Sequence, residues 1–347
     1  MLTGAQITAG NAGQDMTKVA NFEVEQTLTE NQAWIDKAME RCDRWCQANT
    51  TAAGVLFGLV SALAASLHVV GLRGLPKGKN PYQITNHETV CCLLYSLVLA
   101  KYTGGEGVYS KDYARVTLFL FRSVFAMPGF TCNVVGTYLL PSQLFIVLNN
   151  SNMIFAILIA AVILKVYPPT ATWVFVGTFI LGVMVMVYPE ALGISSGRQI
   201  QQKEYELWWI VFPIISGFTG GSVTNLLQIY SGGITLVQNT YWWSLSIALM
   251  TAIIFPMAEG YETLGFREYL LIPILGFFIF SSLALYNLSC RYEKRAAVVT
   301  SVACSQIVMT YILDVIFSGS PLILLNVIGA SIVILSIVGI AWFKSKK

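Results

Sequence analysis

The chain has 347 residues, of which 55% are hydrophobic and only 11% are charged, and its mean hydropathy is +0.64. Soluble domains contain roughly a quarter charged residues, so this composition excludes an ordinary soluble globular protein and favours a polytopic helical membrane protein. The hydrophobic runs are continuous rather than alternating, which excludes a transmembrane β-barrel, and the net charge of +3 identifies no partner.

The first part of the chain is polar. Residues 1–30 lack the apolar core of a signal peptide, so we expect none to be cleaved. From Glu30 to Gln47 apolar residues recur with helical spacing and charges occupy the other face, which predicts an amphipathic helix at the membrane interface. Residues 1–52 are therefore predicted to form a cytoplasmic tail that ends in this helix.

Ten hydrophobic segments follow, most of them about long enough to cross a bilayer as a helix. The segment between Pro141 and Pro189 shows the pattern best, because Lys165-Val-Tyr-Pro-Pro separates two apolar runs and its prolines end one helix and open the next. We predict spans at 53–72, 85–102, 116–139, 144–164, 171–188, 207–227, 237–257, 269–288, 296–317 and 322–343.

The spans divide into two sets of five. Most Lys and Arg residues fall in cytoplasmic segments if both termini are cytoplasmic, which favours that orientation. We predict a first five-helix repeat at 53–188, an extracytoplasmic loop at 189–206, a second five-helix repeat at 207–343 and a basic tail at 344–347. Because five is odd, the second repeat must be inverted, and inverted repeats place a binding site near the midplane of the membrane.

A family resemblance follows from these features. The chain resembles the drug/metabolite transporter superfamily, in particular its EamA-like and nucleotide-sugar-transporter-like solute carriers. The matching features are the five-plus-five spans, the short connection Tyr138-Leu-Leu-Pro-Ser-Gln, Lys165 before a proline-led fifth span, and the closing stretch from Pro321 to Ala330. The resemblance covers about residues 53–343 and implies an all-α fold of ten transmembrane helices, with the fifth and tenth at the periphery. The Gly-Ala-Leu-Asn-Lys string of GDP-sugar carriers is absent, which argues against that substrate.

Arg122 is the most informative polar residue inside a predicted span. It lies about 10 Å along the third span at a rise of 1.5 Å per residue. Two interpretations are open: the side chain extends back to the lipid headgroups, or the guanidinium faces a cavity and binds a phosphate or carboxylate.

Three ionisable residues are predicted at a common depth near the outer side. They are His68, Glu88 and Asp314. Either they form a cluster for ion coupling or gating, or each lies at a hydrated helix end.

Other polar residues inside the spans are candidates for contact with a substrate, and interhelical hydrogen bonding is the alternative role. Asn149 and Asn152 share one face of the fourth span, and Ser301 and Ser305 share one face of the ninth. The full set of these candidates is Asn149, Asn150, Asn152, Tyr138, Ser301, Ser305, Gln306, Tyr286 and Asn225.

Nothing in the sequence indicates an enzyme. There are two histidines, no Gly-rich phosphate loop and no zinc-type spacing among the seven cysteines, so we expect no catalytic residue, no cofactor and no metal. We expect a secondary transporter that moves a small polar metabolite, with an anion such as a nucleotide sugar favoured. The alternative is a non-transporting protein with a carrier fold that acts as a scaffold or assembly subunit. The expected partners are a small-molecule substrate and the lipid bilayer, with no nucleic acid. A homodimer, and the choice between an endomembrane and the plasma membrane, are left open.

Overall fold

The computed structural model describes residues 37, 40–73, 75, 80–102, 113–139, 148–163, 165, 167–191, 211–230, 235–258, 263–318 and 323–342. The chain divides into two units, residues 1–52 and 53–347. In the first unit residues 40–48 are helical, and the side chains of residues 40–50 are exposed apart from that of Cys46. The predicted interfacial helix begins outside the described residues.

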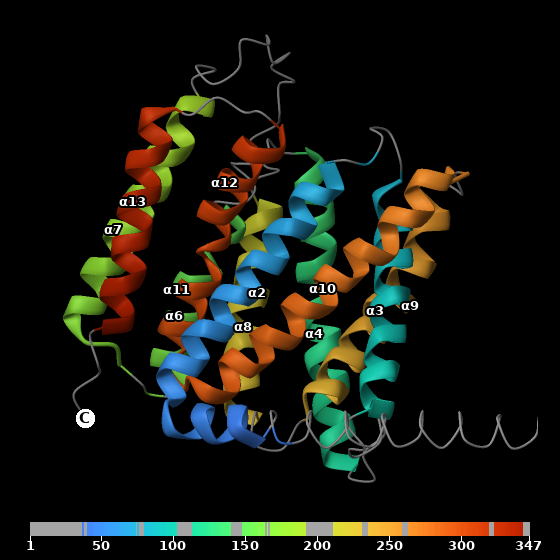
Figure 1. The fold of residues 1–347 in the computed structure, drawn as a ribbon, viewed down its shortest axis with the longest axis horizontal. Coiled ribbons are helices and arrows are strands. Elements are labelled where there is room, and N and C mark those ends of the chain that lie inside the picture. Colours follow the sequence, from blue (N-terminus) through green and yellow to red (C-terminus); the bar gives the residue numbers. More distant parts are fainter. Residues whose placement is uncertain are drawn as a thin grey trace, which may run out of the picture. The chain divides into compact units, whose positions relative to one another are not determined.

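The described part of the chain forms eleven helices and no strand. In order they are α2 (Thr50–Arg73), α3 (Pro81–Tyr102), α4 (Tyr113–Leu139), α6 (Asn152–Ile163), α7 (Thr170–Ala191), α8 (Val211–Tyr230), α9 (Leu236–Ala258), α10 (Phe266–Tyr292), α11 (Ala296–Ala303), α12 (Gln306–Ser318) and α13 (Leu324–Trp342). By length and composition, Thr50–Leu72, Phe266–Tyr292 and Ala296–Phe317 could each cross a membrane. The predicted spans overlap these helices, and the ninth is divided between α11 and α12 (Figure 1).

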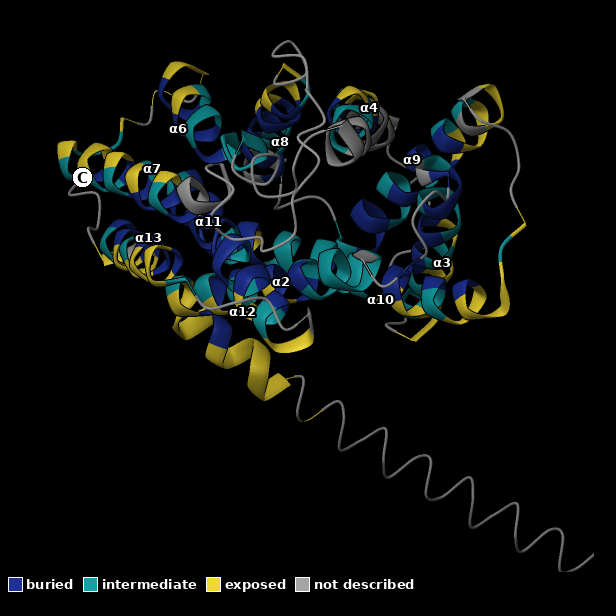
Figure 2. Ribbon diagram, turned by 90° about the horizontal axis from the view of Figure 1, so that it is seen from above, coloured by how far each residue is buried: buried dark blue, intermediate teal, exposed yellow. Residues whose placement is uncertain are grey.

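The helices of residues 53–347 lie in two rows (Figure 2). The first row runs α6, α8, α4, α9, and each helix packs on the next. The second runs α12, α2, α10, α3: Ser66 Oγ on α2 lies 3.1 Å from the carbonyl oxygen of Gln306, Ser61 Oγ on α2 lies 2.8 Å from the carbonyl oxygen of Ser282 on α10, and α10 packs on α3. Helices at equivalent positions of the two predicted repeats therefore occupy equivalent places in opposite rows.

Helices α7 and α13 pack against each other at one edge of these rows (Figures 1 and 2). Their backbones approach closely because two glycines face each other. A Cβ added at Gly329 would lie 2.6 Å from the carbonyl oxygen of Gly182 and 2.6 Å from the backbone nitrogen of Met186. Small residues allow helices to approach in this way where hydrophobic burial in lipid supplies no driving force.

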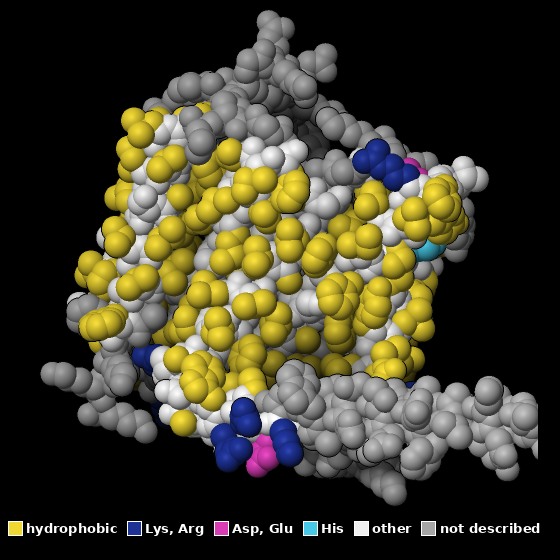
Figure 3. All heavy atoms as spheres, viewed as in Figure 1, with side chains coloured by type: hydrophobic (Ala, Val, Ile, Leu, Met, Phe, Trp, Pro, Cys, Tyr) yellow, Lys and Arg dark blue, Asp and Glu magenta, His cyan; other side chains and the backbone are white. Residues whose placement is uncertain are grey.

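Hydrophobic side chains cover much of the face drawn in Figure 3. On α2 the exposed ones include Leu56, Val60 and Leu63, and on α10 they include Ile274 and Phe277. A contiguous apolar surface of this extent is not stable in water, and it fits the hydrocarbon of a bilayer.

Polar turns interrupt both the fourth and the ninth predicted spans. The N–H of Ser305 donates to the carbonyl of Val302 at 3.0 Å and that of Ile307 to the carbonyl of Cys304 at 3.1 Å, so the chain takes a tighter 3₁₀ course between α11 and α12. In the fourth span a similar turn at residues 150–151 precedes α6. The two turns meet, because Cys304 Sγ lies 3.8 Å from the carbonyl oxygen of Asn150. The predicted span 296–317 therefore corresponds to the apolar segment Ala296–Phe317, which this turn divides into α11 and α12.

Candidate functional site

Arg122 on α4 is buried, with 6% of its surface exposed. Its Nη1 donates to the side-chain oxygen of Asn239 on α9 and lies 3.4 Å from the carbonyl oxygen of the same residue. Its Nε is buried and has no hydrogen-bond partner among the described residues. The guanidinium therefore points into the protein and does not extend to the lipid headgroups.

Two groups on α10 complete the surroundings of this arginine. Tyr286 and Cys290 are close enough to interact electrostatically with the guanidinium. The hydroxyl of Tyr286 lies 2.6 Å from Oγ1 of Thr224 on α8. Side chains from α4, α8, α9 and α10 thus converge here and join the two rows. We call Arg122, Asn239, Tyr286, Cys290 and Thr224 the arginine cluster.

A pocket of about 380 Å³, including the open space at its mouth, borders the arginine cluster. Asn239 and Cys290 belong to both, whereas Arg122 does not line the pocket. The remaining lining residues come from α8, α9 with the residue before it, and α10: Leu227, Thr235, Leu236, Asn287, Leu288 and Arg291.

The outer pair of ionisable residues is also in contact. Nε2 of His68 on α2 lies 3.2 Å from Oε2 of Glu88 on α3, with 17% and 2% of the two side chains exposed. Glu88 therefore lacks the hydrated environment that a solvated helix end would provide. Asp314 is buried on α12.

Comparison with known protein families gives a match over the predicted first repeat. Residues 52–188 match the model of the EamA-like transporter family. The match confirms the resemblance to the drug/metabolite transporter superfamily, of which this family is part, and covers the predicted first repeat. No curated protein matches the chain significantly.

One solved structure, a crystal structure of a protein, is similar to this chain with a TM-score of 0.68 and 12% sequence identity. The superposition covers 83% of this chain and 97% of the other. At this identity the likeness establishes the fold alone. The family that matches residues 52–188 is a family of transporters, and the described residues of this chain form apolar helices that fit a membrane protein.

Two of the polar residues singled out from the sequence hydrogen-bond to neighbouring helices of the EamA-like fold. Nδ2 of Asn225 donates to the carbonyl of Ala156 at 3.0 Å, which ties α8 to α6. Ser301 Oγ lies 3.1 Å from the sulfur of Met153, which ties α11 to α6. These contacts fit the role of interhelical hydrogen bonding.

The three asparagines predicted to contact a substrate lie at the junction of the two interrupted spans, where the turn at residues 150–151 meets the turn at Cys304. Oδ1 of Asn152 is 3.7 Å from Cys304 Sγ, and Asn149 and Asn150 are half-buried in the adjoining turn. Ser305 is buried and its Oγ has no hydrogen-bond partner among the described residues, while Gln306 is half-buried. The side chain of Tyr138 lies outside the described residues. This junction lies near the arginine cluster, because Tyr286 is close enough to Cys304 to interact with it electrostatically.

Asn239, Thr224 and Cys290 were not identified from the sequence. Asn239 lies in the run Gln238-Asn239-Thr240, which looks like the polar start of the seventh span. The one indication in the sequence was that an amide side chain so close to an apolar run needs a hydrogen-bond partner. Among the described residues no group of three or more His, Cys, Asp or Glu side chains could hold a metal ion.

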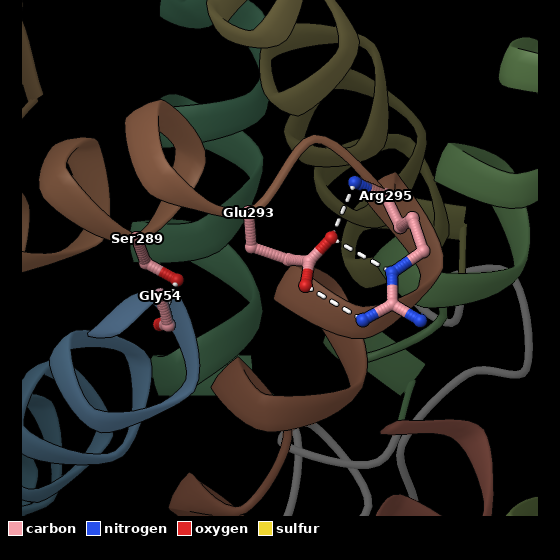
Figure 4. Close-up of polar contacts among 4 residues, drawn as sticks. All are labelled: Gly54, Ser289, Glu293 and Arg295. Carbon is pink, nitrogen blue, oxygen red and sulfur yellow. Dashed lines mark hydrogen bonds and ion pairs between the residues drawn. The ribbon is translucent and has the colours of Figure 1, made fainter. Parts of the chain in front are cut away.

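The connection between α10 and α11 forms a second polar contact region of the EamA-like fold (Figure 4). The carboxylate of Glu293 accepts two hydrogen bonds from the guanidinium of Arg295, at 2.8 and 2.7 Å. These bonds and the charge of Glu293 raise the pKa of Arg295 against the opposing effect of burial, so Arg295 stays charged. Ser289 Oγ donates to the carbonyl of Gly54 at 2.7 Å, which holds the beginning of α2 beside this connection.

Proposed function

We propose that this EamA-like protein is a secondary transporter of a small anionic metabolite and that Arg122 binds its negative charge. A nucleotide sugar or another phosphorylated or carboxylated organic solute has the required chemistry. Arginine is suited to this role because its planar guanidinium binds phosphate and carboxylate groups through two parallel hydrogen bonds.

The observation that carries this proposal is a buried cation without an acidic partner. No carboxylate among the described residues forms an ion pair with Arg122, and its Nε has no hydrogen-bond partner there. Burying an isolated charge costs several kcal/mol, at an order of magnitude, even after the surroundings relax. Neutral contacts with Asn239 offset only part of this cost. An anionic substrate would supply the missing charge, which gives a reason to keep the arginine.

The arrangement of helices supports an alternating-access mechanism. Helices at equivalent positions of the two predicted repeats lie in opposite rows, as expected for ten helices built from inverted repeats. Such repeats provide two related conformations, each open to one side of the membrane. We expect the substrate to bind between the rows, where α8 contacts α10 through Thr224 and Tyr286. Both termini would be cytoplasmic.

A scaffold or assembly subunit with a carrier fold is the second candidate. It is favoured by Asn225 and Ser301, whose side chains bond to neighbouring helices. A scaffold role, however, would give no reason to bury an arginine that has no acidic partner among the described residues.

Thermal unfolding of the detergent-purified protein tests the proposal. A panel of nucleotide sugars, phosphorylated metabolites, amino acids and inorganic phosphate would be added to the full chain. A ligand that binds only the folded state raises Tm, by an amount that corresponds to about 2.7 kcal/mol at a hundred times its Kd. We expect at least one anion to stabilise the wild type.

The variants locate the binding group. Arg122→Gln should abolish the stabilisation, and Arg122→Lys should weaken it, because lysine keeps the charge but lacks the planar pair of donors. Arg267→Gln is the matched control, since Arg267 is exposed at the beginning of α10. Failure of every anion to stabilise a folded wild-type protein would favour the scaffold. Equal stabilisation of Arg122→Gln would show that the anion binds elsewhere.

A further inference from the structure

We propose that His68 on α2 and Glu88 on α3 form a proton-binding site, and that proton binding there is coupled to the transport cycle. The second part of the inference rests on the proposed transport function. The first part rests only on the contact between these two side chains.

The two carboxylate oxygens of Glu88 have different surroundings. Oε2 lies 3.2 Å from Nε2 of His68. Oε1 is buried and has no hydrogen-bond partner among the described residues. A structural carboxylate at 2% exposure would be expected to have donors for both oxygens, because burying an unsatisfied charged oxygen costs more than burying a neutral group. A carboxyl group that alternates between charged and protonated forms needs only one permanent partner.

The neighbours of Glu88 leave His68 as its main titratable partner. On α3 itself the thiol of Cys91 interacts electrostatically with the carboxylate. Helix α10 approaches α3 at Gly276, where an added Cβ would lie 2.9 Å from the carbonyl oxygen of Glu88. Helix α9 contacts α3 through hydroxyls that do not titrate, those of Ser244 and Thr251. None of the described contacts of Glu88 comes from α4 or α12.

The difference in exposure gives the order of the two groups along the proposed proton route. His68 is 17% exposed and Glu88 is 2% exposed, so the imidazole is the nearer of the two to the protein surface. Imidazole relays protons near neutral pH, since its two ring nitrogens can accept and donate in turn. Uptake moves one proton from water through His68 to Glu88 and forms one O–H bond. Release returns that proton to water, and no other bond changes.

Coupling follows from the charge that this proton changes. With one proton shared between imidazole and carboxylate the pair is neutral overall, and a second proton gives it a charge of +1. A transporter whose cavity also binds an anion at Arg122 would then carry proton and anion with linked affinities. By thermodynamic linkage, each must change the affinity of the other by the same factor.

Infrared difference spectroscopy of the purified full chain in lipid tests the proton site directly. Lowering the pH of the wild type should produce the absorption band of a protonated carboxyl group, and Glu88→Gln should lose this band. In His68→Gln the pH dependence of the band should change, because the carboxylate has lost its hydrogen-bond partner among the described residues. Asp314→Asn is the matched control, as Asp314 is a buried carboxyl on another helix, and it should leave the Glu88 band unchanged.

The outcomes separate the two proposals. If no band is lost in Glu88→Gln and none moves in His68→Gln, the proton site is overturned, even if an anion stabilises the protein through Arg122. If the band behaves as expected, the proton site stands whether or not any anion binds. When an anion does bind, its stabilisation of the wild type should vary with pH and that of Glu88→Gln should not. The same pH dependence in both would overturn the coupling.

Discussion

Arg122 on α4 donates to Asn239 on α9, which connects the third predicted span to the seventh. These residues are 117 positions apart and belong to different predicted repeats. The contact satisfies one end of the guanidinium with neutral oxygens, and no carboxylate among the described residues pairs with its positive charge. Asn239 also lines the adjoining pocket, so the residue that accepts the hydrogen bond from Arg122 borders that space.

Asn239→Asp should weaken anion binding without unfolding the protein. The new carboxylate would pair with Arg122 and compete with the substrate, and a hydrogen bond to a charged group is worth about 1.5–3 kcal/mol. We therefore expect the apparent affinity of a stabilising anion to fall about tenfold or more. Titration of Tm against ligand concentration measures this. Asn287→Asp, which adds the same charge to the pocket without a contact to Arg122, should have a smaller effect. Equal losses in both variants would indicate a general charge effect.

Two glycine substitutions on the α7–α13 pair should have opposite effects on stability. Gly329→Ala places a methyl group 2.6 Å from the backbone of α7 and should destabilise the protein by about 1–3 kcal/mol. Gly177→Ala meets nothing within 4 Å and should stabilise α7 by about 0.5–1 kcal/mol. Thermal unfolding in one detergent compares them. A neutral result for Gly329→Ala would mean that the two helices do not approach at this point.

Arg295→Met should be among the more destabilising single changes. It leaves the carboxylate of Glu293, whose side chain is 4% exposed, without its guanidinium partner, at a cost of about 3 kcal/mol. The double variant Glu293→Gln with Arg295→Met removes both charges and should recover most of that loss. Arg44→Met provides the control, because the Arg44–Glu40 pair is exposed and should contribute about 0.5 kcal/mol or less. A double variant no better than Arg295→Met would contradict the ion-pair explanation.

Tyr286→Phe and Thr224→Ala should lose the same interaction. Each removes the 2.6 Å hydrogen bond between α10 and α8, which is worth about 1 kcal/mol. Their effects on the free energy of unfolding should therefore not add, and the double variant should be only slightly less stable than either single one. Chemical denaturation in mixed micelles, followed by tryptophan fluorescence, measures the three values. Additive losses would show that the two hydroxyls act independently.

Much of the helical layout could be predicted from the sequence. Nine of the ten predicted spans each overlap one helix, and the boundary at Pro168 and Pro169 before α7 follows from the local chemistry of proline. The interruption at Cys304 and Ser305 was missed because the stretch is uniformly apolar or small and contains neither proline nor glycine. Its cause is tertiary, since the turn lies against Asn150 of the other interrupted span.

The candidate site was predicted only in part. Arg122 and Tyr286 were both named, and the structure brings them together, but Asn239 and Thr224 were not. Polar residues near helix ends are common in membrane proteins, so a sequence pattern does not distinguish one that contacts a buried cation from one that meets water. The sequence predicted His68 and Glu88 at one depth in the membrane. It did not predict their burial, because burial depends on how the helices pack against each other.

The sequence by itself determined that this chain is a helical membrane protein, because runs of apolar residues and the positions of prolines act locally along the chain. Only the tertiary structure decided which polar residues meet: Arg122 with Asn239, His68 with Glu88, and the turn at Cys304 with that at Asn150. The physical reason is that lipid is as apolar as the protein interior. A transmembrane helix can be hydrophobic on every side, so its sequence carries little information about which face contacts another helix.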